Sequence, residues 1–251
     1  MDRCFIMASD STHLRLIDRE LRQIEIESKG IVQRFPLKPI PDDLYEAMAG
    51  AFDIEGDPSE KIQSYYADTC MRPVISTFNF DTPFYINSAV KIIRLTLRDK
   101  VIESQIEDLE GRLLSFAGVP FDETIEERIN LYRELFVDDQ KIDRFRIGCL
   151  EMFGDATYAN LRRDPRANLT LSWYNPKDSI SRSYQINVIA EVVPPGTPYY
   201  RYMRVLRTLF SSRFLDSKRD YYVAAYKFWV SDILDKSLIA KPGFVLDSSS
   251  S

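Results

Sequence analysis

The sequence offers little of the common chemistry of catalytic side chains. It contains a single histidine, His13, so a Ser-His-Asp triad, a Cys-His pair or a His-rich zinc site would have to use that residue. His13 stands near the start of the chain, before a charged amphipathic stretch, and is interpreted as a histidine of the surface or of a helix start. Chemistry supplied by a cofactor that needs no histidine is therefore favoured.

The cysteines and carboxylates also indicate neither a reactive cysteine pair nor a metal site. Cys4, Cys70 and Cys149 lie far apart and form no CxxC pair; with no recognisable signal peptide they favour a reducing compartment, so a cytoplasmic location is expected. Cys149 alternates with Ile147 in a strand-like run and is expected to be a small buried residue. The glutamates in residues 103–110 repeat at helical spacing and indicate a solvated helix face, so no metal site is expected.

The composition excludes two large classes of partner. The 251 residues carry a net charge of -5, whereas nucleic-acid binders usually neutralise phosphates with a basic surface. The apolar runs are shorter than the roughly 20 residues that cross a bilayer, so no membrane partner is expected. With 45% apolar and 28% charged residues, the chain is typical of globular proteins and long enough to bury a full core.

Residues 1–69 are predicted to form a helical region packed on the rest of the protein. The spacing of apolar and charged residues predicts an amphipathic helix over the first half of residues 11–29 and leaves residues 23–26 open. Two further helices are predicted at residues 41–52 and 57–69. Asp57 or Ser59 can cap the second of these helices.

Residues 70–240 are predicted to form one mainly β domain. β-Branched and aromatic residues predict six strands, at residues 74–80, 84–97, 144–153, 167–174, 183–193 and 220–234. Apolar residues three and four apart predict helices at residues 155–163 and 198–214 and a helical hairpin inserted at about residues 100–140. The strands can all pair antiparallel, which favours a small closed barrel with helices around it. The tail, residues 241–251, is expected to be flexible.

The order of these elements resembles that of the FMN-binding split barrel of the pyridoxamine 5'-phosphate oxidase-like superfamily. The segments STFNFDTPFYINSAVKII and DYYVAAYKFWVSDILD are similar to the opening hairpin and the last strand of that family. The strongest likeness is GDATYANLRRDPRANLTL, since the family has a short helix of the form Ser-x-Lys-x-x-x-Leu, then Asn/Asp-Pro-Arg and a strand. Those places are occupied by Asp155, Thr157, Leu161, Asp164, Pro165 and Arg166.

The resemblance implies a six-stranded antiparallel split β-barrel that forms a homodimer and binds FMN at the subunit interface. It further implies an FMN-dependent oxidoreductase with a small-molecule substrate. The FMN phosphate would lie at the start of the helix that holds Thr157, where backbone N–H groups and the helix dipole favour an anion. Thr157 and Asp155 replace the Lys and Ser of the family, and the hairpin has no counterpart of a family arginine.

The candidate cofactor-binding residues follow from this resemblance, and no catalytic residue is identified. Arg146 and Arg144 share one strand face and could supply the charge that Thr157 lacks, or could simply face solvent. The candidates are Asn87, Ser88, Lys91, Arg146, Thr157, Asn160 and Trp173. The polar residues among them could also face water, and Trp173 could be an ordinary core residue.

A second hypothesis stays open beside the flavin enzyme. The chain could be a non-catalytic split barrel that binds a different cofactor or small ligand, or an assembly partner that acts through its helical insertion. Haem is disfavoured, because an axial histidine would have to be His13, which lies outside the predicted barrel. The colour of the purified protein separates the flavin hypothesis from the others.

Overall fold

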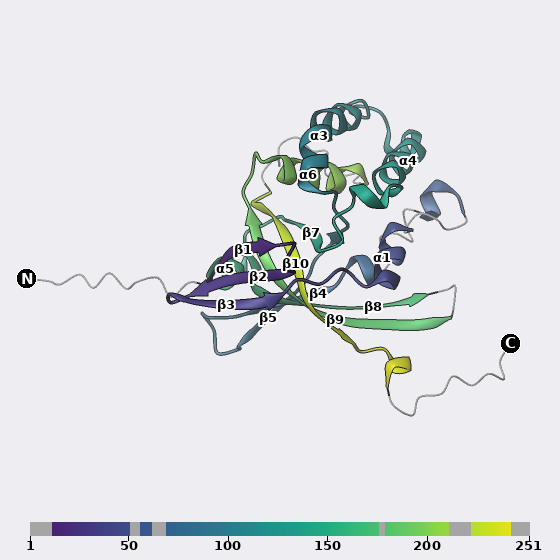
Figure 1. The fold of residues 1–251 in the computed structure, drawn as a ribbon. Coiled ribbons are helices and arrows are strands. Elements are labelled where there is room, and N and C mark those ends of the chain that lie inside the picture. Colours follow the sequence, from purple (N-terminus) through teal and green to yellow (C-terminus); the bar gives the residue numbers. More distant parts are fainter. Residues whose placement is uncertain (1–11, 51–55, 62–68, 176–178, 211–221, 242–251) are drawn as a thin grey trace, which may run out of the picture.

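The computed structural model describes residues 12–50, 56–61, 69–175, 179–210 and 222–241 (Figure 1). The strands are β1 (Thr12–Asp18), β2 (Gln23–Ser28), β3 (Ile31–Pro36), β4 (Val74–Phe78), β5 (Ile86–Val90), β6 (Ile93–Arg94), β7 (Arg146–Glu151), β8 (Arg166–Asn175), β9 (Ile180–Val193) and β10 (Ala224–Asp235). The α-helices are α1 (Asp42–Ala49), α3 (Asp99–Leu114), α4 (Ile125–Phe136), α5 (Ala156–Arg163) and α6 (Pro198–Leu209). Short 3-10 turns cover Thr69–Met71, Phe121–Glu123, Asp139–Lys141 and Leu238–Ala240.

Most of the strands form one curled antiparallel sheet of seven strands, in the order β5-β4-β8-β9-β10-β7-β6. Its two end strands, β5 and β6, are consecutive in the chain and are separated only by Lys91 and Ile92. The sheet therefore curls until its ends come together. The prediction of a single strand over residues 84–97 was wrong in this respect, because the chain leaves β5 after Val90 and pairs with β7 only from Ile93 on. The other predicted strands and the mainly β class are confirmed, with shifted ends.

The prediction of an amphipathic helix over the first half of residues 11–29 was wrong, because Thr12–Asp18 is the strand β1. This part of the chain contains β1 and β2, which with β3 make a separate three-stranded antiparallel sheet. Lys29 and Gly30 both have positive φ, at 52° and 77°, as a tight two-residue hairpin turn requires. Ile24 and Ile26 alternate inward and are fully buried, so the apolar period here is two and not 3.6.

The small sheet is attached to the large one by apolar contacts and one arginine. Ile24 and Ile26 pack with Trp229 of β10 in a core cluster of their own. Arg19 donates to the buried carboxylate of Asp143, at 3.0 Å, and its guanidinium lies 5.1 Å from the Trp229 ring centroid. The predicted N-terminal helical region is thus, in its first part, a sheet docked on the curled seven-stranded sheet.

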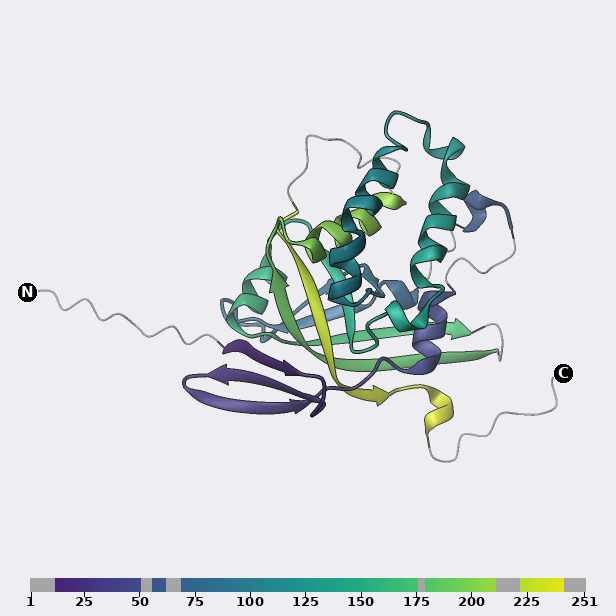
Figure 2. The same ribbon diagram turned by 45° about the horizontal axis from the view of Figure 1, so that its top comes forward.

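The helices α3, α4 and α6 gather on the other side of the large sheet from the small sheet, whereas α5 lies beside β1 (Figures 1 and 2). The predicted helical insertion is confirmed as α3 and α4, which leave the sheet after β6 and return at β7. Its base is closed by backbone pairing, since Leu97 bridges Ile142 and the N–H of Arg98 donates to Lys141, at 2.8 Å. Among the described residues, no helix has the length and apolar composition to cross a membrane.

Glu103 and Glu107 of α3 are exposed, as expected of a solvated helix face, and Glu107 and the half-buried Glu110 also join the insertion to α6. Arg201 of α6 donates to Glu110 at 3.0 Å and to Glu107 at 2.8 Å. Arg128 of α4 is fully buried and donates to the carbonyl of Leu209, at 2.9 Å. The three helices therefore form one packed layer over the end of the sheet.

Several predictions fall partly outside the described residues. Of the helix predicted at residues 57–69, the structure describes residues 58–61 as helical, and Asp57 and Glu60 cap each other's backbone N–H groups, each at 3.0 Å. The predicted helix at residues 198–214 is confirmed as far as Leu209. The predicted flexible tail lies outside the described residues, apart from Lys241.

The helix α6 packs tightly against the sheet at Gly148 of β7. A Cβ at this position would lie 2.5 Å from the Thr96 side chain, 2.7 Å from the sulfur of Met203 and 2.8 Å from the hydroxyl of Tyr199. That hydroxyl donates to the carbonyl of Tyr226 in β10, at 3.0 Å. The absence of a side chain at Gly148 therefore sets how deep α6 sits on the sheet.

We expect Gly148→Ala to destabilise the protein. The added methyl overpacks the contact between β7 and α6, which typically costs about 1–3 kcal/mol of unfolding free energy. Urea unfolding followed by circular dichroism measures the change. Gly111→Ala is the matched control, because a Cβ at Gly111 in α3 meets nothing within 4 Å and alanine favours the helix. Equal stability of the two variants would contradict the close approach.

Candidate functional site

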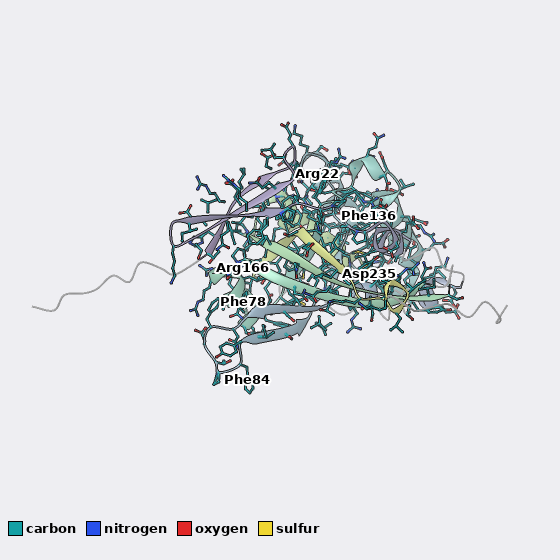
Figure 3. The ribbon with its side chains drawn as sticks, turned by 60° about the horizontal axis from the view of Figure 1, so that its bottom comes forward. Arg22, Phe78, Phe84, Phe136, Arg166 and Asp235 are labelled. Atoms are coloured by element: carbon teal, nitrogen blue, oxygen red, sulfur yellow. The ribbon has the colours of Figure 1, made fainter. Side chains whose placement is uncertain are left out.

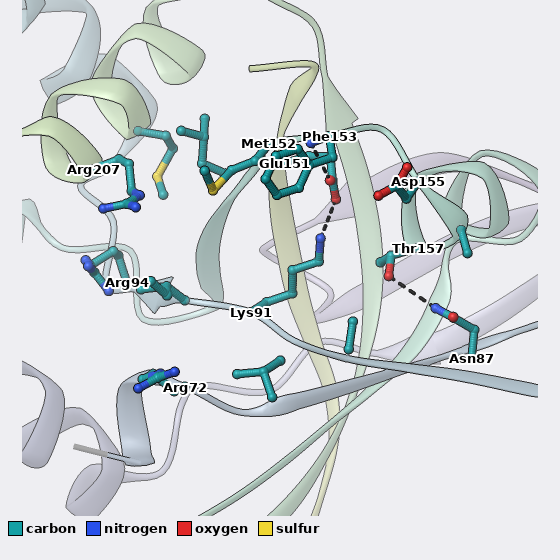
Figure 4. A pocket seen from close by; sticks show the side chains of 16 residues that line it. Arg72, Asn87, Lys91, Arg94, Glu151, Met152, Phe153, Asp155, Thr157 and Arg207 are labelled. Atoms are coloured by element: carbon teal, nitrogen blue, oxygen red, sulfur yellow. Dashed lines mark hydrogen bonds and ion pairs between the residues drawn. The ribbon is translucent and has the colours of Figure 1, made fainter. Parts of the chain in front are cut away.

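A pocket of about 450 Å³ opens where the two ends of the curled sheet meet (Figure 4). Its wall is built from β5, the break between β5 and β6, the end of β7, the start of α5 and one face of α6. The lining residues are Arg72, Asn87, Ala89, Val90, Lys91, Ile92, Arg94, Leu150, Glu151, Met152, Phe153, Asp155, Ala156, Thr157, Met203 and Arg207.

Strand alternation separates the two adjacent polar candidates on β5, Asn87 and Ser88. Asn87 and Ala89 are half-buried and line it, whereas Ser88 is exposed. The Ser88 hydroxyl lies 3.1 Å from the hydroxyl of Ser76 on the neighbouring strand β4. Of the two adjacent candidates on this strand, the structure thus places Asn87 in the pocket and Ser88 on the sheet surface.

The start of α5 is held against the β4–β5 hairpin by two amide side chains. Asn87 donates to the Thr157 hydroxyl at 3.2 Å, and Asn160 donates to the Thr77 hydroxyl at 3.1 Å. Thr157 is buried and lines the pocket, while Asn160 is buried behind it. Asp155 is the residue that precedes the helix, and its carboxylate accepts no capping bond from the described backbone.

A buried carboxylate organises the centre of the pocket. Glu151 is 1% exposed and accepts from the Lys91 ammonium at 2.6 Å and from the Tyr226 hydroxyl at 2.9 Å. Its second oxygen accepts from the backbone N–H groups of Phe153 and Gly154, at 3.1 and 3.2 Å. Burial by itself raises the pKa of Glu151, but these donors, Lys91 above all, outweigh it and hold the pKa below its usual value. Glu151 is therefore an ionised anchor of the pocket.

A group of basic side chains lies on the opposite side of the pocket from Asp155 and Thr157 (Figure 4). Arg72 precedes β4, Arg94 is in β6 and Arg207 is in the last turn of α6. Arg94 is 3% exposed and donates to the carbonyl of Ile93, at 2.7 Å. Together with Lys91, these residues give the lining more positive than negative charge.

Arg72, Arg94, Arg207 and Glu151 were not predicted from the sequence. Two of them carry a signal that could have found them, since Arg94 and Glu151 are charged residues that directly follow apolar residues in strand-like runs. Arg72 and Arg207 carry no such signal, because only the curling of the sheet and the docking of α6 bring them to the pocket.

The remaining candidates lie away from the pocket. Arg146 is fully buried and bonds Asp99 at 3.0 Å, with Asp143 at 3.2 Å, so its guanidinium neither lines the pocket nor faces solvent. Arg144 instead pairs with Asp42 at the surface. Trp173 is buried in the core, 5.7 Å from the ring of Tyr184. The structure thus brings Asn87, Lys91 and Thr157 together, and places Ser88, Arg146, Asn160 and Trp173 elsewhere.

Two other reactive groups contribute no chemistry to the pocket. Cys149 is fully buried, as expected, and burial raises the pKa of its thiol to about 12, which keeps it protonated and unreactive. His13 is exposed on β1, outside the pocket. Within the described part of the chain, no cluster of His, Cys, Asp and Glu could hold a metal ion.

Comparison with known proteins finds distant structural likeness only. No protein-family model and no curated protein sequence matches the chain. Among solved structures, an FMN-binding protein from Syntrophomonas wolfei subsp. wolfei has 14% identity over 78% of this chain and 88% of its own, with a TM-score of 0.41. An F420 reductase has 8% identity over 65% of this chain and 89% of its own, with a TM-score of 0.37. HupZ from Group A Streptococcus has 11% identity over 67% of this chain and 86% of its own, with a TM-score of 0.35.

We expect Lys91→Met to destabilise the protein by about 3 kcal/mol at neutral pH, because it leaves the buried charge of Glu151 without its cation. In the wild type, the pKa of Glu151 is lowered from 4.5, so its contribution to the unfolding free energy is present above that value and is lost as the pH falls through the folded-state pKa. In the Lys91→Met variant, burial raises the pKa of Glu151 instead. The difference in unfolding free energy between the wild type and the variant therefore becomes smaller towards acidic pH.

Urea unfolding as a function of pH measures this difference. Arg163→Met is the control, because Arg163 pairs with Asp81 at 2.6 Å in an exposed position, and such pairs contribute less than about 1 kcal/mol. A Lys91→Met variant that is as stable as this control at neutral pH would show that Glu151 does not depend on Lys91.

Proposed function

We propose that the chain binds flavin mononucleotide in this pocket and is an oxidoreductase of the pyridoxamine 5'-phosphate oxidase-like type, with a small-molecule substrate. One observation carries the proposal. Asn87, Lys91 and Thr157, which the motif likeness singled out at separate places in the sequence, meet in a single pocket. Its volume of about 450 Å³ lies in the range of small-molecule sites.

The residues present fit such a cofactor. The start of α5, with the Thr157 hydroxyl, would hold the phosphate, because the helix dipole and the first N–H groups favour an anion. Apolar side chains from β5, β7 and α6 would contact the ring system, among them Ala89, Leu150 and Met203. When bound, FMN supplies the electron transfer, and the protein supplies position and an environment with little water.

The side chains around the pocket favour a positioning role over proton transfer. Glu151 is ionised and saturated with donors, so it has no proton to give. Burial, followed by the charge of Glu151, raises the pKa of Tyr226, whose hydroxyl stays protonated and committed to that carboxylate. The pair therefore fixes the shape of the pocket around the ligand.

An exposed apolar surface next to the pocket supports the homodimer in which two chains share the cofactor site. Phe84 and Tyr85, at the tip of the β4–β5 hairpin, are 78% and 83% exposed, and the hairpin extends away from the body of the protein (Figure 3). Val90 and Phe153 are 58% and 67% exposed and also line the pocket. The apolar surface is therefore continuous with the pocket mouth, as a site at a subunit interface requires.

A non-catalytic protein that binds another small anion in the same pocket is the second candidate. The three arginines on the far side from α5 favour it, because they offer an anion site that does not depend on Thr157. The absorbance of the purified protein decides between the two. Flavin bands, with FMN released on denaturation, support the proposal, and a colourless protein that ignores added FMN refutes it.

We expect Thr157→Glu to abolish FMN retention, because a carboxylate at this helix start repels the phosphate. We expect Asp155→Asn to tighten FMN binding about two- to fivefold, because it removes a charge of the same sign from the same place. Fluorescence titration with FMN measures both changes. Thr170→Glu, an exposed position on β8, is the control for added charge, and circular dichroism verifies the fold. Unchanged FMN binding in both variants would refute the phosphate site.

We expect Ile86→Lys to convert a dimer into a monomer, because Ile86 is 53% exposed on the apolar face of β5 and a buried ammonium at an interface is costly. Light scattering after gel filtration measures the mass. Leu21→Lys is the control, because Leu21 is 74% exposed on the turn of the small sheet. A wild type that is already monomeric, or a variant that remains a dimer, would contradict this interface.

A further inference from the structure

The pocket has two chemically different sides. On one side lie the start of α5, the Thr157 hydroxyl and the Asp155 carboxylate; on the other lie the guanidinium groups of Arg72, Arg94 and Arg207 (Figure 4). The cofactor phosphate proposed above needs only the first side. The arginine side therefore lies outside the proposed phosphate site.

The arginine side is built from parts of the fold that are held firmly. Arg94 is 3% exposed, and its strand β6 pairs with β7 directly at Gly148. Arg207 lies one turn after Met203 on α6, the helix that contacts β7 at that same glycine. The same glycine therefore positions both β6 and α6, the two elements that carry Arg94 and Arg207 at the pocket wall.

The charges of the lining favour an anion on this side. Of the two lining carboxylates, Glu151 is paired with Lys91, and Asp155 lies beside Thr157. The guanidinium group is planar and donates in a fork that matches carboxylate and phosphate oxygens. Three such groups from separate segments of the chain give geometric selection as well as charge.

We propose that Arg72, Arg94 and Arg207 bind the anionic group of the substrate, so that the substrate is a small organic anion that carries a carboxylate or a phosphate. The role of this anion as a substrate rests on the proposed function, whereas anion binding itself does not. The cofactor phosphate and the substrate anion then occupy opposite sides of the pocket, which limits their mutual repulsion. Arg72, Arg94 and Arg207 are positioning residues for the substrate.

The test uses the full chain loaded with FMN and titrated with inorganic phosphate or succinate at constant ionic strength. The change in flavin absorbance and the shift in melting temperature give the affinity for each anion. We expect saturable binding in the wild type and a loss of about tenfold or more in Arg72→Gln and in Arg207→Gln, as for other hydrogen bonds to charged groups. Arg162→Gln, an exposed position on α5, is the matched control and should bind like the wild type. The tighter of the two anions identifies the group.

Riboflavin, which lacks the phosphate, separates the possible outcomes. If the arginine variants lose FMN but keep riboflavin, the cofactor phosphate binds at the arginines and the proposal is overturned. Anion binding that is equal in the wild type and in these variants also overturns it. If the wild type binds no flavin, the proposed function fails; phosphate binding to that colourless protein that depends on Arg72 and Arg207 still supports the anion site, and its absence refutes it.

Discussion

The buried ion pair between Lys91 and Glu151 is the interaction on which the pocket depends. Lys91 stands at the break between β5 and β6, where the two ends of the sheet meet, and Glu151 ends β7. The same carboxylate binds β10 through Tyr226 and holds the turn into α5 through the N–H groups of Phe153 and Gly154. A single buried charge thus connects the β5–β6 break, the end of β7 and the turn into α5, and it also binds β10. The charge is tolerated in the interior because the Lys91 ammonium, the Tyr226 hydroxyl and two backbone N–H groups all donate to it.

A second buried carboxylate does the same for the N-terminal sheet. Asp143 is 1% exposed and binds Arg19 from the small sheet and Arg146 from β7. Arg146, which the motif likeness offered as a cofactor contact, is thereby an internal tie between β7 and the first turn of α3. The protein uses paired charges at its internal joints, while apolar packing fills the volume between them.

The sequence predicted the elements whose apolar period is strong and local. The helical insertion, α5 and the long strands β8, β9 and β10 all follow from spacing and from proline positions. The first half of residues 11–29 was mistaken for a helix because dense charges hide the strand period of two, which the buried Ile24 and Ile26 and the tight turn at Lys29 and Gly30 reveal. Asn87, Lys91 and Thr157 could be predicted as site residues from motif likeness, whereas Arg72 and Arg207 reach the pocket only through the curl of the sheet and the docking of α6. The local spacing of residues along the sequence therefore could not predict that these two arginines line the pocket.

The helical insertion leaves and re-enters the sheet at neighbouring, hydrogen-bonded strands. Its base is closed by the bridge between Leu97 and Ile142 and by the backbone bond from Arg98 to Lys141, so the two ends of the excursion are already joined. The stretch that connects α3 to α4 is therefore not needed to set the register of the strands. The entropic cost of closing a loop also rises only slowly with the length of the loop. For protein engineering, this connection is the natural splice point for a foreign domain or a reporter, since added chain there leaves the architecture of the cavity untouched.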